Sequence, residues 1–181
     1  MSNDLIFLKA EPTDAVEAVQ LIGLADPEAI IDISGKATYA DALKEYEKNF
    51  SRTDVYFSFK NTIVAKINNQ VVGCILFFKG EDEVNYFFGS EREDSGIRES
   101  DDDEIYIDSL AVDERYRGKG IAKQLIKYVV QESVSLGYKK ISLLADVSQP
   151  HLGKMYSDLG FKVKSKMILL DTEYDKFVFE H

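Results

Sequence analysis

The residues best suited to chemistry lie in one turn, Arg115-Tyr116-Arg117-Gly118-Lys119-Gly120, between an apolar run typical of a strand and one typical of a helix. The first N–H groups of a helix have no partners within the helix and carry partial positive charge. Glycine lets a ligand approach the backbone closely, and arginine and lysine add full positive charge beside it. The turn is therefore suited to a diphosphate, although a basic turn with a glycine cap would use the same residues.

Two common phosphate-binding sequences do not occur at this turn. The dinucleotide fingerprint G-x-G-x-x-G fails because its third glycine position holds Lys123. The P-loop pattern G-x-x-x-x-G-K-S/T is absent from the sequence as well. The turn therefore matches neither pattern.

The turn and a second motif together resemble a known family. Arg115-x-x-Gly118-x-Gly120 resembles the Q/R-x-x-G-x-G/A coenzyme A signature of the GNAT N-acetyltransferase superfamily. Ile107 to Val112 resembles the bulged strand that precedes this signature, and Met155 to Phe161 is similar to the later L-Y-x-x-x-G-F motif. Because the two motifs have the family's order and spacing, the resemblance implies an acetyl-CoA-dependent N-acetyltransferase that acts on a primary amine.

The resemblance also implies which residues hold the cofactor, acetyl-CoA. Backbone amides of the glycine turn are expected to bind the pyrophosphate, and the backbone of the bulged strand is expected to bind the pantetheine arm. Gln149 stands where the family often has asparagine, and its longer side chain is a departure from the pattern. The residues expected to contact coenzyme A are Leu110, Ala111, Val112, Arg115, Arg117, Gly118, Lys119, Gly120, Ile121, Ala122, Gln149 and Tyr156.

Acetyl transfer from a thioester to an amine requires a base, a donor to the developing oxyanion and a proton for the departing thiolate. A strand-edge N–H such as that of Leu110 is suited to the oxyanion. The resemblance implies that Tyr156 is the general acid, since a phenol with a pKa of about 10 is protonated at neutral pH. Asp108 is the candidate base or ammonium-binding group, with a structural role as the alternative, and Tyr106 is expected to share the acceptor pocket.

Three other side chains are weaker candidates for chemistry. Glu104 is a third choice for the base. His151 has a suitable pKa but is expected to be exposed at the start of a helix. Cys74 is expected to be a core residue, because no activating group lies near it in the sequence.

Composition excludes several classes of function. The 181 residues favour one domain, residues 1–181, and one cysteine with two histidines argues against a disulfide and against a metal site. A net charge of −10 argues against nonspecific nucleic-acid binding. No apolar run approaches the roughly 20 residues that cross a bilayer, and the N-terminus lacks a secretory signal, so a cytoplasmic location without membrane partners is expected.

Most of the negative charge lies in one segment, Glu81 to Glu104, which holds eleven acidic and two basic residues. A solvated loop or hairpin extension would account for such a run. The alternative is an acidic lip that attracts an amine or a basic partner.

The periodicity predicts a mixed α/β domain in the order βααβββαβαββ, and the resemblance implies a mostly antiparallel sheet with a splayed parallel pair and helices on both faces. Asn68 and Asn69 are typical of a tight hairpin turn, and the alternation slips near Ser109 as at a bulge. The expected strands are 4–9, 62–67, 71–78, 105–112, 139–147, 161–170 and 174–179, and the expected helices run from Thr13 to about Leu24, from Tyr39 to Phe50, from the glycine turn to Gly137 and from Pro150 to Leu159.

Other functions stay open at this level. They are an acyltransferase with another acyl group or acceptor, a catalytically silent acyl-CoA sensor or interaction module, and a binder of nucleotide diphosphates. The sequence does not identify the acceptor amine. A homodimer is a further possibility, formed through the last strand pair at Met167 to Leu170 and Phe177 to Phe179.

Overall fold

The computed structural model describes residues 4–25, 27–86, 97–169 and 171–181. One sheet of seven strands runs through it in the order β1-β2-β3-β4-β5-β7-β6. Its strands are β1 (Ile6–Lys9), β2 (Thr62–Ile67), β3 (Gln70–Lys79), β4 (Glu104–Val112), β5 (Lys140–Asp146), β6 (Lys162–Leu169) and β7 (Thr172–Glu180). Only β4 and β5 pair in parallel, so the predicted mixed sheet is confirmed.

The described part of the chain has five α-helices and four short 3-10 helices. The α-helices are α1 (Ala15–Ala25), α2 (Pro27–Ser34), α3 (Tyr39–Phe50), α4 (Ile121–Leu136) and α5 (Pro150–Asp158). The 3-10 helices are η1 (Pro12–Asp14), η2 (Phe59–Asn61), η3 (Gly80–Asn85) and η4 (Glu114–Tyr116). The predicted order lacked α2, because its eight residues are too few to show a clear helical periodicity. The helix begins at Pro27, and proline is tolerated in a first turn because its missing N–H needs no partner there.

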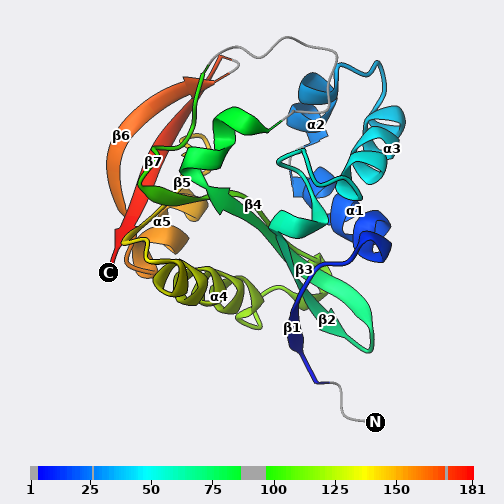
Figure 1. Ribbon diagram of the computed structural model, residues 1–181, viewed down its shortest axis with the longest axis horizontal. Helices are drawn as coiled ribbons and strands as arrows, with labels where there is room; N and C mark the ends of the chain where they lie inside the picture. The colour runs from blue at the N-terminus through cyan, green and yellow to red at the C-terminus, as the bar shows by residue number, and fades with distance from the viewer. Residues whose placement is uncertain (1–3, 26, 87–96, 170) are drawn as a thin grey trace.

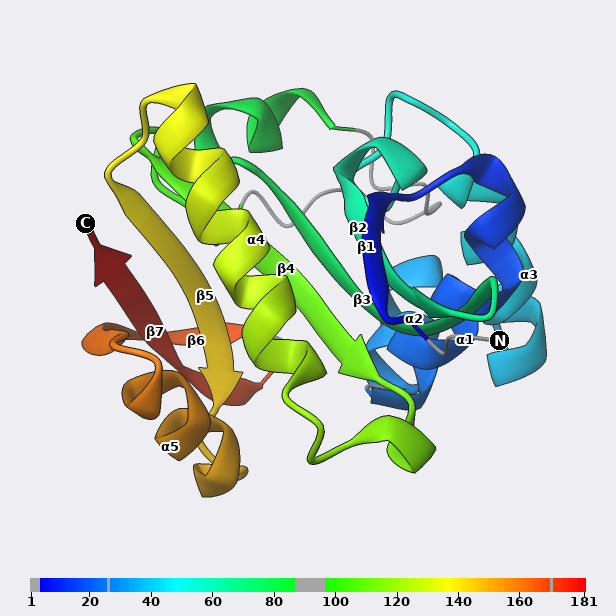
Figure 2. The same ribbon diagram turned by 90° about the horizontal axis from the view of Figure 1, so that it is seen from below.

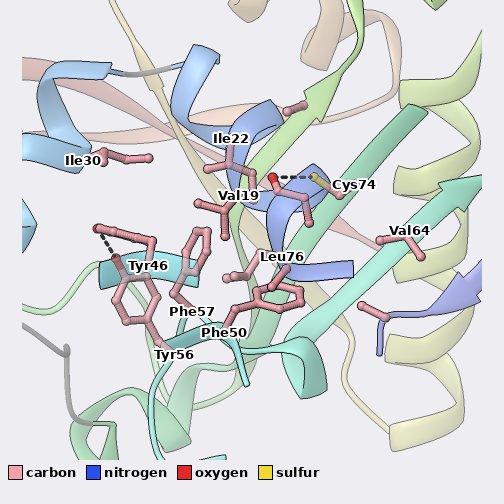
Figure 3. Packing of buried hydrophobic residues seen from close by; sticks show 14 of the residues in the cluster. Val19, Ile22, Ile30, Tyr46, Phe50, Tyr56, Phe57, Val64, Cys74 and Leu76 are labelled. Carbon is pink, nitrogen blue, oxygen red and sulfur yellow. Dashed lines mark hydrogen bonds between the residues drawn. The ribbon is translucent and has the colours of Figure 1, made fainter. Parts of the chain in front are cut away.

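Helices cover both faces of the sheet (Figures 1 and 2). Figure 1 shows α1, α2 and α3 together on one side, and Figure 2 shows α4 lying along β4 and β5 on the other, with α5 near the end of β5. Side chains of a strand alternate between these layers, as on β3, where Cys74 and Leu76 face the cluster under α1 and α3 while Ile75 faces α4. Figure 3 shows the first cluster, with Val19 of α1 and Phe50 of α3 pointing toward the sheet.

The predicted hairpin and helix ends are confirmed. Asn68 and Asn69 join β2 to β3 with φ angles of 50° and 65°, the left-handed values that a tight hairpin turn needs. Gly137 ends α4 with φ 83°, and its N–H donates to the carbonyls of Ser133 and Val134. Within the described residues, no helix is long and apolar enough to cross a membrane.

The strand at the C-terminal edge of the sheet is β6 alone. Its partner β7 lies between β5 and β6, and Phe177 of β7 is buried, so the predicted exposed pair of strands is wrong for Phe177 to Phe179. The reason is that β7 returns into the sheet beside β5, with Phe177 opposite Leu143. The edge strand β6 is largely exposed, and Lys164 and Lys166 on it form ion pairs with β7.

A buried ion pair and one hydrogen bond join the strands β4, β5 and β7. Lys176 of β7 lies 2.9 Å from a carboxylate oxygen of Glu104 at the start of β4, and Ser142 of β5 donates to the same oxygen at 2.5 Å. Glu104 is only 1% exposed, so each charge of the pair relies on the other to offset the cost of its burial. Breaking such a pair by removing one partner typically costs about 3–5 kcal/mol.

Candidate active site

One cleft of about 1590 Å³ contains nearly all the predicted site residues. We call the part lined by the glycine turn, the adjoining end of β4 and α5 the turn side. We call the part formed by the lining residues up to Asp108 the acidic side, because its described charged residues are three carboxylates and no base. The acidic side is lined by Leu21, Ile22, Leu24, Ile30, Ile33, Tyr46, Tyr56, Phe57, Glu83, Ile97, Glu99, Tyr106 and Asp108.

The glycine turn presents a row of free amides at the start of α4. Gly118 and Gly120 have φ angles of 76° and 78°, which other residues rarely adopt. The first N–H group of α4 that forms a helical hydrogen bond is that of Gln124, which donates to the carbonyl of Gly120. The N–H groups of residues 118–123 donate to no acceptor among the described residues, which leaves six consecutive donors at the positive end of α4. Of these residues, all but Lys119 line the cleft.

The cations of the turn are held in different ways. The guanidinium of Arg115 is 2.6 Å from the carboxylate of Asp113, and this hydrogen bond lowers the pKa of Asp113. Arg117 donates through Nε to the carbonyl of Val112 at 3.1 Å. Lys119 lies over the ring of Tyr116 and is not among the cleft-lining residues, whereas the other residues predicted to contact coenzyme A line the cleft.

A glycine that the sequence analysis did not single out sets the position of α4. A Cβ atom at Gly73 of β3 would lie 3.1 Å from a side-chain methyl of Ile121 and 3.3 Å from the carbonyl oxygen of Ala111. Glycine lets the first turn of α4 pack this closely on the sheet, because an added Cβ atom would require these neighbours to shift. The free amides are thereby held beside the end of β4.

The parallel strands separate next to this turn. β4 and β5 pair only from Glu104–Lys140 to Ile107–Leu143. Farther along β4, the N–H of Asp113 donates to Val72 on the β3 side, so the alternating N–H groups of Leu110 and Val112 point to the opposite, unpaired edge. The structure therefore has the splayed strand edge that the resemblance implied.

Asp108 is the extra residue of the predicted bulge. Leu76 of β3 pairs with Ser109 and Phe77 pairs with Ile107, so Asp108 has no partner in the register. Its carboxylate accepts a hydrogen bond of 2.6 Å from the hydroxyl of Ser109. Burial, followed by the negative charge of Glu99, raises the pKa of Asp108 to about 7.

Tyr156 reaches the same cleft from α5. Its ring packs against Phe161 and Phe177, with ring centroids 6.0 and 5.9 Å away. Burial raises the pKa of Tyr156 to about 12, and its hydroxyl forms no hydrogen bond with any described residue. A protonated phenol without an internal partner is free to donate a hydrogen bond to a ligand.

The sequence analysis missed the residues that surround Asp108 on the acidic side. Tyr106 lines this side as predicted, and its hydroxyl donates a hydrogen bond to Glu99, whose pKa is raised by burial. Tyr46 and Tyr56 reach the same cavity, with their hydroxyl oxygens 3.3 Å apart (Figure 3). Nothing in the sequence distinguishes Glu99 from the ten other acids of its segment.

The acidic segment is only partly a solvated loop. Glu83 is buried and accepts the backbone N–H groups of Glu99 and Ser100 at 2.9 and 3.0 Å. Glu83 and Glu99 both line the cleft, in keeping with the alternative of an acidic lip. Residues 87–96 of this segment lie outside the described residues.

The weaker candidates are placed away from chemistry or on the rim. Glu104 does not line the cleft, because it is bound within the ion pair to Lys176. His151 lines the turn side but is exposed, as expected. Cys74 is buried, and burial raises the pKa of its thiol to about 12, so it stays a protonated core residue.

Comparisons with known proteins agree with this geometry. The family model for the acetyltransferase (GNAT) family matches residues 28–161. Spermine/spermidine N(1)-acetyltransferase of Bacillus subtilis (strain 168) is 30% identical over 64 residues, a match that covers 35% of this chain and 42% of that protein.

Solved structures share the fold over nearly the whole chain. An N-acetyltransferase from Staphylococcus aureus Mu50 has a TM-score of 0.82 at 23% identity and covers 96% of this chain and 100% of its own. The polyamine N-acetyltransferase of Drosophila melanogaster has a TM-score of 0.67 at 15% identity, covering 98% of this chain and 100% of its own. From the matched motifs, the splayed sheet and the family model together, the chain belongs to the acetyltransferase (GNAT) family.

Proposed function

We propose that this protein transfers an acetyl group from acetyl-CoA to a primary amine of a cationic acceptor. The observation that carries the proposal is the continuity of one cleft. Its free amides at the glycine turn lead along the unpaired edge of β4 to Asp108 and Tyr156. A phosphate group at one end and a reacting amine at the other would therefore share the same cavity.

The turn side has the chemistry that a coenzyme A molecule requires. Six amides without internal acceptors, the positive end of α4 and the side chains of Arg115 and Arg117 are suited to the pyrophosphate. The space beside Gly118 and Gly120 is open, since nothing lies within 4 Å of the position that a Cβ atom would take at either residue. The N–H groups of Leu110 and Val112 are suited to the amide groups of an extended pantetheine arm.

In the proposed reaction, each residue acts on a proton or a developing charge. Acetyl-CoA supplies an activated acetyl thioester and a thiolate leaving group. Asp108 accepts the proton of the amine, since a carboxylate with a pKa of about 7 is partly ionised at neutral pH and is a stronger base than an ordinary aspartate. The N–H of Leu110 donates to the oxyanion, and the hydroxyl of Tyr156 donates to the departing sulfur.

A cationic acceptor is supported by the charge of the acidic side. Glu83, Glu99 and Asp108 line it, and the match to a spermine/spermidine acetyltransferase points to the same class of compound. An ammonium group has a pKa of roughly 10.4 in water, so the acceptor arrives as a cation and is attracted by these carboxylates.

The proposal is tested by binding and turnover in parallel. Titration calorimetry should detect acetyl-CoA binding, and ADP should compete more weakly because it lacks the pantetheine arm. An assay of free thiol over a panel of amines should then show acceptor-dependent release. Acetyl-CoA binding without turnover on any amine would contradict the transferase and favour a silent sensor, whereas equal affinity for ADP would favour a nucleotide binder.

A further inference from the structure

The basic residues that line the cleft are confined to its turn side, where acidic residues such as Asp113 and Asp146 line it as well. Every arginine and lysine among the described lining residues lies on the turn side, on η4, α4 and α5 or next to them. They are Arg115, Arg117, Lys123 and Lys154. The described residues of the acidic side include three carboxylates and no basic side chain. An acceptor with a carboxylate or phosphate of its own would therefore meet only like charge there.

Two carboxylates on the acidic side have unused hydrogen-bonding capacity. Glu99 accepts from the hydroxyl of Tyr106, and Asp108 accepts from the hydroxyl of Ser109. No described residue donates to the second carboxylate oxygen of either side chain, and neither forms an ion pair with a described cation. Each therefore keeps one acceptor oxygen for a ligand.

Glu83 differs from them and has a structural role. It accepts the backbone N–H groups of Glu99 and Ser100, and its carboxylate lies 3.6 Å from Nε of Arg98. Arg98 also donates to the carbonyl of Gly80 at 2.7 Å. These contacts fix the backbone at Glu99, so that its side chain is held over the cleft beside Tyr106.

Among the described residues, no cation forms an ion pair with Glu99 or Asp108, whereas Arg98 pairs with Glu83. Burial raises the pKa of both groups, and the charge of Glu99 raises the pKa of Asp108 further. Two half-buried carboxylates of like charge are costly unless a cation compensates them. The lining of this side also includes apolar side chains such as Ile22, Ile30 and Phe57, which suit a hydrocarbon chain.

We propose that the acceptor carries two cationic nitrogens joined by an aliphatic spacer, and that Glu99 binds the nitrogen that does not react while the reacting amine lies at Asp108. This inference rests on the proposed acetyl transfer and specifies its substrate class as an aliphatic diamine without an acidic group. Glu99 is thus a specificity-determining residue, held in place by Tyr106 and Glu83.

A set of three acceptors with five carbon atoms each tests the proposal without any mutation. The unmodified protein is assayed with pentane-1,5-diamine, pentylamine and 5-aminopentanoate, which end in an ammonium, a methyl and a carboxylate group. A hydrogen bond to a charged group is worth about 1.5–3 kcal/mol, so kcat/KM for the diamine should exceed that for pentylamine by about 10- to 100-fold. The aminopentanoate should react most slowly, and pentylamine reacting as fast as the diamine would overturn the proposal.

Two matched variants then assign the preference to one side chain. Glu99→Gln should lower the ratio of kcat/KM for the diamine to that for pentylamine by about tenfold or more. Glu81→Gln removes the same charge from the same segment, but Glu81 is exposed and does not line the cleft. In this variant the ratio of kcat/KM for the diamine to that for pentylamine should therefore equal the ratio in the unmodified protein. An equal loss for both amines in Glu99→Gln would mean that Glu99 does not bind the second nitrogen.

A binding measurement separates this inference from the proposed function. Pentane-1,5-diamine is titrated calorimetrically into the protein with coenzyme A present, for the unmodified chain and for both variants. If no amine is acetylated but diamine affinity still falls about tenfold in Glu99→Gln alone, the transferase proposal fails and the recognition by Glu99 stands. If amines are acetylated but diamine affinity is the same in all three proteins, the recognition fails and the transferase stands. A thermal unfolding scan confirms that each variant is folded.

Discussion

The two sides of the cleft are built in different ways. The turn side takes its amides from consecutive residues, 118–123, and holds them with two positive φ angles and one helix start. The acidic side gathers Tyr46 from α3, Glu99 from the segment before β4, and Tyr106 and Asp108 from β4 itself. Recognition by the turn side is therefore local and uses the backbone, whereas recognition by the acidic side is tertiary and uses side chains.

Asp108 stands at the border between the two. As the extra residue in the bulge of β4, it lies next to the strand edge that continues to the glycine turn, and its pKa is set partly by Glu99 of the acidic side. The difference teaches that the donor site follows from a motif, whereas the acceptor site can change with the surrounding helices and loops. The following changes test each side separately.

The largest effect is expected from Asp108→Asn. Loss of a general base should lower kcat/KM by about 10²–10⁴-fold at neutral pH. Because the pKa of Asp108 is raised to about 7, kcat/KM of the unmodified protein should bend near pH 7 as the carboxylate forms. A profile measured over about 1.5 to 2 pH units on either side of a pKa of about 7 should show this bend, and the variant should lack it. An unchanged bend would assign it to another group.

The same raised pKa has a consequence for stability. Below its ordinary pKa the Asp108 carboxyl is protonated in both the folded and the unfolded chain and costs nothing. As the pH rises toward 7, the unfolded chain ionises first, so the free energy of unfolding should fall up to about pH 7 and then level. Asp108→Asn should remove this loss and raise the melting temperature at pH 8 while it lowers activity.

A smaller loss is expected from Tyr156→Phe on the turn side. The variant keeps the ring packed against Phe161 and Phe177 and removes only the hydroxyl that we propose as the acid. We expect kcat to fall by about 10²-fold, at the lower end of general acid catalysis, because a thiolate leaves more readily than an amine. Calorimetry should show unchanged acetyl-CoA affinity, and an unchanged kcat would remove Tyr156 from the reaction.

The glycine turn is tested by comparing two glycines of the same helix. Gly120→Ala and Gly137→Ala each force an alanine into a left-handed conformation, at about 1–2 kcal/mol, and at neither position does an added Cβ meet another atom. Both variants should therefore lose similar thermal stability. Only Gly120→Ala should also weaken coenzyme A binding, by about 5- to 30-fold, and equal affinities would disprove the role of the turn.

The smallest effect is a shift in the pH profile of Glu99→Gln. Removing the negative charge of Glu99 makes ionisation of Asp108 easier, so the pKa of Asp108 falls and the bend in kcat/KM moves to lower pH. The monoamine is the acceptor to use, because it reports Asp108 without the second nitrogen. A bend that moves to higher pH, or does not move, would show that the two carboxylates are not coupled.

The sequence by itself determined the positions of the strands, the hairpin turn, the bulge near Ser109 and the glycine turn. Each of these depends on neighbouring residues: positive φ angles at asparagine or glycine, alternation along a strand, and free amides at a helix start. A short sequence window contains all the information that such features need.

Only the tertiary structure decided what surrounds Asp108. The helix α2 was missed because one short, proline-initiated helix gives little periodicity, and Glu99 was missed because its role depends on Tyr106 and Glu83 meeting it in space. The burial that raises the pKa of Asp108 to about 7 comes from elements far apart in the chain. Desolvation and charge coupling depend on distance in three dimensions, which the spacing of residues along a chain does not contain.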